Sequence, residues 1–180
     1  HLATIGGESH GVIEGIGTLS PAARGWDSNR LVAADADLAT ARALAAAFAE
    51  RARYRDGSGP DPARTFRLLE KTPKNALRVP FLAEVFGNAS FVYLYRDPRE
   101  TLSSMLDAWR SGRFVTYPHL PDWSGPPWSL LLTPGWREWR GMDLAHIVAR
   151  QWMATVETLI DDLQRLPPER WCVASYSRLV

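Results

Sequence analysis

The sequence lacks several features that define large classes of protein. It has one cysteine, Cys172, so neither an internal disulfide nor a cysteine zinc site can form, and its apolar neighbours predict a buried thiol. No apolar run approaches the roughly 20 residues that a membrane-spanning helix needs. No signal peptide is visible either, so we expect a cytoplasmic, reducing location. The four histidines show no metal-ligand spacing, and no metal site is expected.

A surplus of charge of either sign is also missing, which argues against a general nucleic-acid binder. The 180 residues carry a net charge of +1, with 23% charged and 46% hydrophobic residues. A small local surplus lies in the middle, where residues 61–114 hold nine basic and six acidic side chains. The length suffices for one compact domain, and neither half shows an independent core pattern. We therefore expect residues 1–180 to form a single domain.

The hydrophobic pattern of the chain predicts alternating strands and helices. Residues 1–25 are rich in glycine and predict a loop and a short helix, followed by an alanine-rich helix over Asp27 to Arg55. Strands are predicted at 66–71, 90–95 and 171–175, and helices at 72–86, from Pro98 onward and at 144–166. The apolar run at 90–95 is typical of a strand buried on both faces. This order predicts an α/β fold in which right-handed crossovers join parallel strands.

Residues 111–143 interrupt this alternation and form an apparent insertion. They contain many prolines and glycines together with four tryptophans, Trp123, Trp128, Trp136 and Trp139. A loop of this length is uncommon unless it has a function. The tryptophans predict either an acceptor pocket or lid that excludes water, or an apolar cluster that holds a long loop in place.

The segment Arg96–Ser104 (RDPRETLSS) carries the clearest chemistry. Arg96 directly follows the strand predicted at 90–95, and Asp97-Pro98 begins the helix that carries Ser104. Ligands of open α/β sheets bind at the carboxyl ends of strands, and helix N-termini favour phosphate. Arg96 and Ser104 can therefore hold an anion with a guanidinium and a hydroxyl. The alternative is a surface ion pair beside a serine in a helix interior.

The same segment resembles the 3′-phosphate-binding segment of sulfotransferases that use 3′-phosphoadenosine 5′-phosphosulfate (PAPS). Gly6–His10, Glu70–Asn75 and Trp171–Val180 resemble further segments of this family in the same order, nearest to bacterial relatives of the protein-tyrosine sulfotransferases. The resemblance implies a P-loop NTPase-like parallel sheet flanked by helices. It also implies PAPS as co-substrate and sulfuryl transfer to an acceptor hydroxyl or amine. The acceptor stays open between a tyrosine, a carbohydrate, a lipid and a small phenol.

Roles for individual residues follow from the resemblance. Glu8 matches the base of the protein-tyrosine branch, and His10 is an alternative base two residues on. Lys71 is the last residue of the strand predicted at 66–71, where its ammonium would reach the bridging oxygen of the phosphosulfate. These three residues are the catalytic candidates.

The binding candidates come from the segments around two later strands. Arg96 and Ser104 would hold the 3′-phosphate, and Tyr176 matches the tyrosine that lies near the adenosine in the family. Lys74 and Arg99 are expected as secondary phosphate contacts, although solvated charges at a helix start would explain both equally well.

One element of the family is missing from the sequence. Sulfotransferases begin with a strand and a loop rich in Gly, Ser and Thr that cradles the 5′-phosphosulfate, and neither GxxxxGK[ST] nor Arg-Ser-Gly-Thr-Thr occurs here. We expect this loop upstream of His1. Residues 1–180 would then be a fragment whose sheet lacks its central first strand, and they would be unstable or inactive alone.

Two other functions stay open from the sequence. One is a non-catalytic module of the same fold that binds nucleotides, or a protein partner through the tryptophan-rich loop. The other is a nucleotide kinase, although no residue set for Mg²⁺ is apparent.

Overall fold

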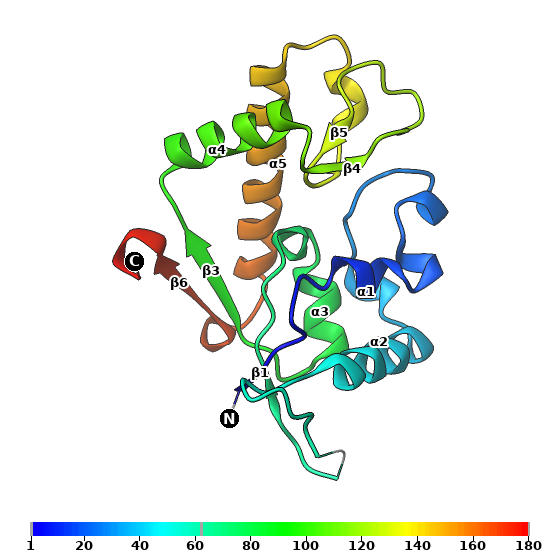
Figure 1. The fold of residues 1–180 in the computed structure, drawn as a ribbon, viewed down its shortest axis with the longest axis vertical. Helices are drawn as coiled ribbons and strands as arrows, with labels where there is room; N and C mark the ends of the chain where they lie inside the picture. The colour runs from blue at the N-terminus through cyan, green and yellow to red at the C-terminus, as the bar shows by residue number, and fades with distance from the viewer. Residues whose placement is uncertain (1, 62, 180) are drawn as a thin grey trace.

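The computed structural model describes residues 2–61 and 63–179, which form short sheets flanked by helices (Figure 1). The strands are β1 (Leu2–Ala3), β2 (Arg67–Leu68), β3 (Phe91–Tyr95), β4 (Val115–Tyr117), β5 (Trp128–Ser129) and β6 (Trp171–Ser175). The α-helices are α1 (His10–Glu14), α2 (Leu38–Arg51), α3 (Val79–Val85), α4 (Pro98–Ser111) and α5 (Leu144–Gln164). Short 3₁₀ turns lie at Gly17–Leu19, Ala22–Arg24, Ala33–Asp35, Pro73–Leu77, Trp136–Trp139, Pro168–Arg170 and Tyr176–Arg178. No helix in the described part of the chain is long and apolar enough to cross a membrane.

Two pairs of parallel strands define the topology. β1 pairs with β2, and β3 pairs with β6 in a register that places Tyr95 opposite Ser175. Helices α1 and α2 connect the first pair, and α4 and α5 connect the second. The expected parallel strands with helical connections are therefore confirmed. The sheet is nevertheless divided, because no strand among the described residues joins β2 to β3.

Aspartates begin the three longest helices. The side chain of Asp37 in α2, of Asp97 in α4 and of Asp143 in α5 accepts a backbone N–H in the first turn. Such an N-cap satisfies one of the donors that a helix start leaves unpaired. The helix predicted from Asp27 is wrong in its first part, since α2 begins only after the Asp37 cap.

The face of the β3–β6 pair that carries Val92 and Leu94 is open. Val92 is 63% exposed and Leu94 45%, so the strand expected to be buried on both faces is not. Cys172 lies opposite Val92 and is exposed, which also corrects the expectation of a buried thiol. The physical reason is that β3 has one partner strand, and the described residues leave this face uncovered.

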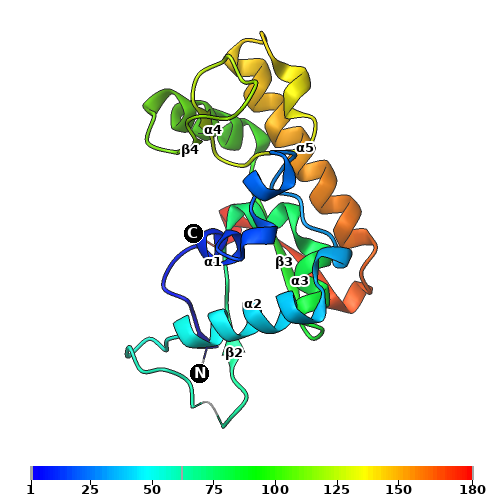
Figure 2. The same ribbon diagram turned by 90° about the vertical axis from the view of Figure 1, so that its right-hand side faces the viewer.

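The tryptophans of residues 111–143 form an apolar cluster against α4 and α5. Figures 1 and 2 both show this segment at one end of the protein, with α4 and α5 beside it. Trp128 is fully buried at the centre, and its ring contacts those of Trp109, Trp123, Trp136 and Trp139. Its indole N–H donates to the carbonyl oxygen of Leu131 at 2.8 Å. Of the two expectations for this segment, the cluster is the one that the packing supports.

A second apolar cluster lies around α1, α2 and α3. Its buried members are Ile13, Leu19, Leu31, Leu44, Phe48 and Phe81. Leu38, the first residue of α2, lies outside this cluster and is 66% exposed. The packing of α1 in this cluster brings the beginning of the chain against the segment that follows β2.

Trp128→Ala should destabilise the protein by about 3–5 kcal/mol, because it removes the largest side chain from the centre of a close-packed cluster. Urea unfolding followed by circular dichroism measures this change. Val92→Ala on the open sheet face is the matched control and should change the free energy of unfolding by less than about 0.5 kcal/mol. Equal effects of the two substitutions would contradict the packing described.

Acid should weaken the helix starts. A backbone hydrogen bond from Thr40 lowers the pKa of Asp37, and one from His146 lowers the pKa of Asp143. A carboxyl whose folded pKa lies below its unfolded value of about 3.9 stabilises the folded state at higher pH, and this contribution disappears as the pH falls through the folded pKa. Urea unfolding between neutral pH and pH 3 should therefore depend less on pH in Asp37→Asn, which still caps but does not titrate. An unchanged pH profile would refute this account.

Candidate functional site

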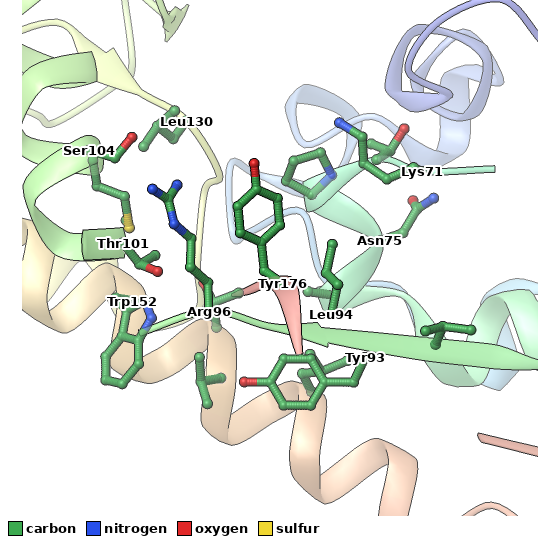
Figure 3. Close-up of a pocket in the computed structure, with 18 of the residues that line it drawn as sticks. Lys71, Asn75, Tyr93, Leu94, Arg96, Thr101, Ser104, Leu130, Trp152 and Tyr176 are labelled. Carbon is green, nitrogen blue, oxygen red and sulfur yellow. The ribbon is translucent and has the colours of Figure 1, made fainter. Parts of the chain in front are cut away.

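A pocket of about 920 Å³ lies beside β3 and contains four of the predicted site residues (Figure 3). Lys71 enters from the segment after β2, Arg96 and Ser104 from the end of β3 and from α4, and Tyr176 from the residue after β6. Side chains of α5, among them Trp152, form part of the apolar lining. The size is within the range of small-molecule sites, which span about 300–1,000 Å³.

Parallel pairing brings Arg96 and Tyr176 together. Tyr95 and Ser175 are partners in the β3–β6 register, so the next residue of each strand leaves the sheet at the same edge. The Arg96 guanidinium lies 5.2 Å from the centre of the Tyr176 ring, within the range of a cation–π contact. Figure 3 shows Arg96 beside Tyr176, with Ser104 on one side of this pair and Lys71 on the other.

A glutamate on α4 holds the Arg96 side chain through its Nε nitrogen. Its Nε donates to Glu100 at 3.0 Å, in an ion pair between residues four apart. Figure 3 shows the two terminal nitrogens on the side of Ser104. A guanidinium and a hydroxyl that converge on one space can together bind an anionic oxygen group.

Arg99 and Lys74 are not brought to this pocket. The Arg99 side chain is 90% exposed, and its Nη2 lies 3.1 Å from Asp97, which raises the pKa of Arg99 and lowers that of Asp97. The Lys74 side chain is only 7% exposed, and its Nζ lies 3.0 Å from Glu14. Neither side chain is among those that line the pocket, so the geometry does not favour them as phosphate contacts.

The three catalytic candidates meet at one place. Glu8 Oε1 lies 3.4 Å from the Nζ of Lys71, and Glu8 Oε2 lies 3.3 Å from the Nδ1 of His10. All three side chains are substantially exposed, as an acceptor substrate would require. Glu8 and His10 thus lie close to Lys71, although they are far from it in the chain. Lys71 itself lines one end of the pocket.

The segment that carries Lys71 is shaped by its own hydrogen bonds. The helix predicted at 72–86 is split into a 3₁₀ turn at Pro73–Leu77 and α3, and the Thr72 side chain before the turn makes no capping hydrogen bond. The Thr72 hydroxyl instead accepts the backbone N–H of Ser9 at 2.7 Å. Glu70 accepts hydrogen bonds from Ser9 and Thr72, contacts that its place beside Lys71 in the sequence does not indicate.

A buried group of charges lies behind this segment. The Glu14 carboxylate contacts both Lys74 at 3.0 Å and Arg78 at 2.7 Å, and the Tyr117 hydroxyl lies 3.1 Å from Lys74. Burial lowers the pKa of Arg78, and the hydrogen bond with Glu14 opposes this shift. The group ties α1 to the 3₁₀ turn after Lys71 and to β4. No sequence signal marked it, because its members lie in three distant segments.

Among the residues that the structure describes, no group of three or more His, Cys, Asp or Glu side chains could hold a metal ion. The Trp171–Val180 segment, which contributes Tyr176, is described as far as residue 179, so Val180 lies outside the described residues.

Comparison with known proteins gives one match. A family model described as the sulfotransferase family matches residues 16–125, which is more than half of the chain. The matched range contains Lys71, Arg96 and Ser104, whereas Glu8 and Tyr176 lie outside it. No curated protein and no solved structure matches the chain.

Proposed function

The chain belongs to the sulfotransferase family, and we propose that it moves a sulfuryl group from PAPS to an acceptor hydroxyl or amine. One observation carries the proposal: Lys71, Arg96, Ser104 and Tyr176 line the same pocket, although they come from three separate parts of the chain. The sequence resemblance alone predicts that each of these residues either binds PAPS or assists transfer of the sulfuryl group. Their convergence in space is support that the sequence could not supply.

Arg96 and Ser104 hold the 3′-phosphate of the donor in this proposal. The terminal nitrogens of Arg96 can form paired, charge-assisted hydrogen bonds with phosphate oxygens, and the Ser104 hydroxyl adds a further donor. The Tyr176 ring lies against Arg96 at the same edge of the sheet, where it can contact the adenosine. The residues present therefore fit the phosphorylated end of PAPS.

Glu8 and Lys71 carry the transfer step. Bound PAPS supplies the sulfuryl group and a phosphate leaving group. Glu8 accepts the proton of the attacking acceptor hydroxyl, with His10 as the alternative base. Lys71 stabilises the negative charge that develops on the phosphate oxygen as its bond to sulfur breaks. The 3.4 Å contact between Glu8 and Lys71 is short enough for both to act on one reacting centre.

The P-loop NTPase-like sheet is part of the same proposal. Residues after β2 and most of β3 line one pocket, and neither strand has a second partner among the described residues. A parallel strand between these two edges would pair their backbone groups. A loop at the carboxyl end of such a strand would lie between Lys71 and Arg96, where the 5′-phosphosulfate is expected.

The alternative of a partner-binding module that uses the tryptophan-rich loop has less support. Trp128, Trp136 and Trp139 are buried in the cluster with α4 and α5, so they do not form an exposed aromatic surface.

Arg96→Ala and Ser104→Ala should each weaken the binding of adenosine 3′,5′-bisphosphate, the product form of the donor. Loss of one charge-assisted contact costs about 1.5–3 kcal/mol, which corresponds to roughly ten- to hundredfold in affinity. Isothermal titration calorimetry measures the effect. Arg99→Ala is the matched control, because it removes an arginine three residues away that lies outside the pocket, and it should bind as the wild type does. Unchanged affinity in Arg96→Ala would remove the basis of the proposed donor site.

Glu8→Gln should lower turnover while donor binding stays the same. Loss of a general base typically costs about 10²–10⁴-fold in rate. The comparison uses the complete protein, with turnover assayed by transfer of labelled sulfate and binding by calorimetry with adenosine 3′,5′-bisphosphate. His10→Ala is measured in parallel. Wild-type turnover in Glu8→Gln together with a large loss in His10→Ala would assign the base to His10 instead.

A further inference from the structure

The Glu70 carboxylate joins two segments that lie far apart in the sequence. Its Oε1 accepts the backbone N–H of Ser9 at 3.2 Å and also the hydroxyl of Thr72. Its Oε2 accepts the side-chain amide of Asn75. Both oxygens are thus engaged, and the contact with Ser9 spans 61 residues of chain.

Ser9 lies between Glu8 and His10, the two candidate bases. Ser9 is fully buried and directly precedes α1, yet its side chain does not cap the helix. Its backbone N–H is instead shared by Thr72 at 2.7 Å and Glu70 at 3.2 Å. A buried amide needs such acceptors, and a carboxylate is a stronger acceptor than a neutral oxygen. The positions of Glu8 and His10 therefore depend on this anchor.

Glu70 also directly precedes Lys71 in the chain. The Lys71 ammonium does not pair with Glu70 but reaches Glu8. The network thus holds the backbone beside Lys71 and the backbone beside Glu8 against each other, while the side chains of both stay available to a substrate.

We propose that Glu70 is a positioning residue that sets Glu8 and His10 against Lys71 through the Ser9 amide. The inference rests on the proposed function, since it assigns a role to those three residues. A positioning role differs from that of a second base, because a base needs a carboxylate oxygen that is free to take the proton of the acceptor hydroxyl. Both Glu70 oxygens accept hydrogen bonds from the protein itself.

The conservative variant Glu70→Gln separates the two roles. Its amide oxygen can still accept from Ser9 and Thr72. Asn75 can turn its amide over to accept from the new NH₂ group, because its Oδ1 has no hydrogen-bond partner among the described residues. A positioning residue should therefore be rescued by glutamine, whereas a base should not.

The experiment compares Glu70→Ala, Glu70→Gln and the control Glu84→Ala, an exposed glutamate on α3. Turnover of the complete protein should fall on the order of 10²-fold in Glu70→Ala, the cost of a misplaced reacting group, and return nearly to wild type in Glu70→Gln. Calorimetric affinity for adenosine 3′,5′-bisphosphate should be the same in all variants, because Glu70 does not hold the 3′-phosphate.

A second readout needs no turnover. Residues 1–180 contain two lysines, Lys71 and Lys74, so ¹³C-labelled lysine incorporated during expression of this segment gives two side-chain NMR signals to compare. Glu70→Ala should shift the Lys71 signal, and Glu70→Gln should restore it. The signal of Lys74, buried against Glu14, reports that the fold is intact.

Three results separate failure of this inference from failure of the proposed function. An inactive Glu70→Gln with wild-type lysine signals would make Glu70 a base and overturn the positioning role. Wild-type turnover and lysine signals in Glu70→Ala would show that Glu70 positions nothing. Absence of donor binding in the complete wild-type protein would refute the proposed function, while the Lys71 signal would still test the anchor.

Discussion

The parallel pairing of β3 with β6 is the constraint on which the candidate site depends. Because Tyr95 and Ser175 are partners, Arg96 and Tyr176 must leave the sheet at the same edge. The Asp97 cap then turns the chain directly into α4, which carries Ser104 back over the pocket. A shift of one residue in this register would move every following side chain to the other face of the sheet. The proposed anion site therefore depends on strand pairing and not on the RDPRETLSS segment by itself.

Two further sets of buried contacts stabilise the geometry of the candidate site. The tryptophan cluster packs residues 111–143 against α4 and α5, which fixes the helix that carries Ser104. The buried contacts of Ser9 with Glu70 and Thr72 fix the start of α1, and with it the group of Glu8, His10 and Lys71. The proposed binding residues and the proposed catalytic residues are thus stabilised by different sets of contacts. Both groups of residues border the pocket beside β3.

Local patterns were enough to predict the elements nearest the proposed binding residues. The strand at 171–175 and the helix from Pro98 were found where expected, because apolar periodicity and an Asp-Pro start are local signals. Exposure of Val92 was not predicted, since it depends on which distant segment covers the strand. The late start of α2 was also missed, although its Asp37 cap is a local signal. Glu70 was missed for the same reason: beside Lys71 it resembles a solvated charge, and only the contact across 61 residues shows its partner.

The central claim is that this pocket holds the 3′-phosphorylated end of an adenosine nucleotide. A crystal structure with adenosine 3′,5′-bisphosphate tests it most directly. The account predicts the 3′-phosphate between the Arg96 guanidinium and the Ser104 hydroxyl, with the adenosine against the Tyr176 ring. A nucleotide bound elsewhere, or a 3′-phosphate that contacts neither Arg96 nor Ser104, would contradict it.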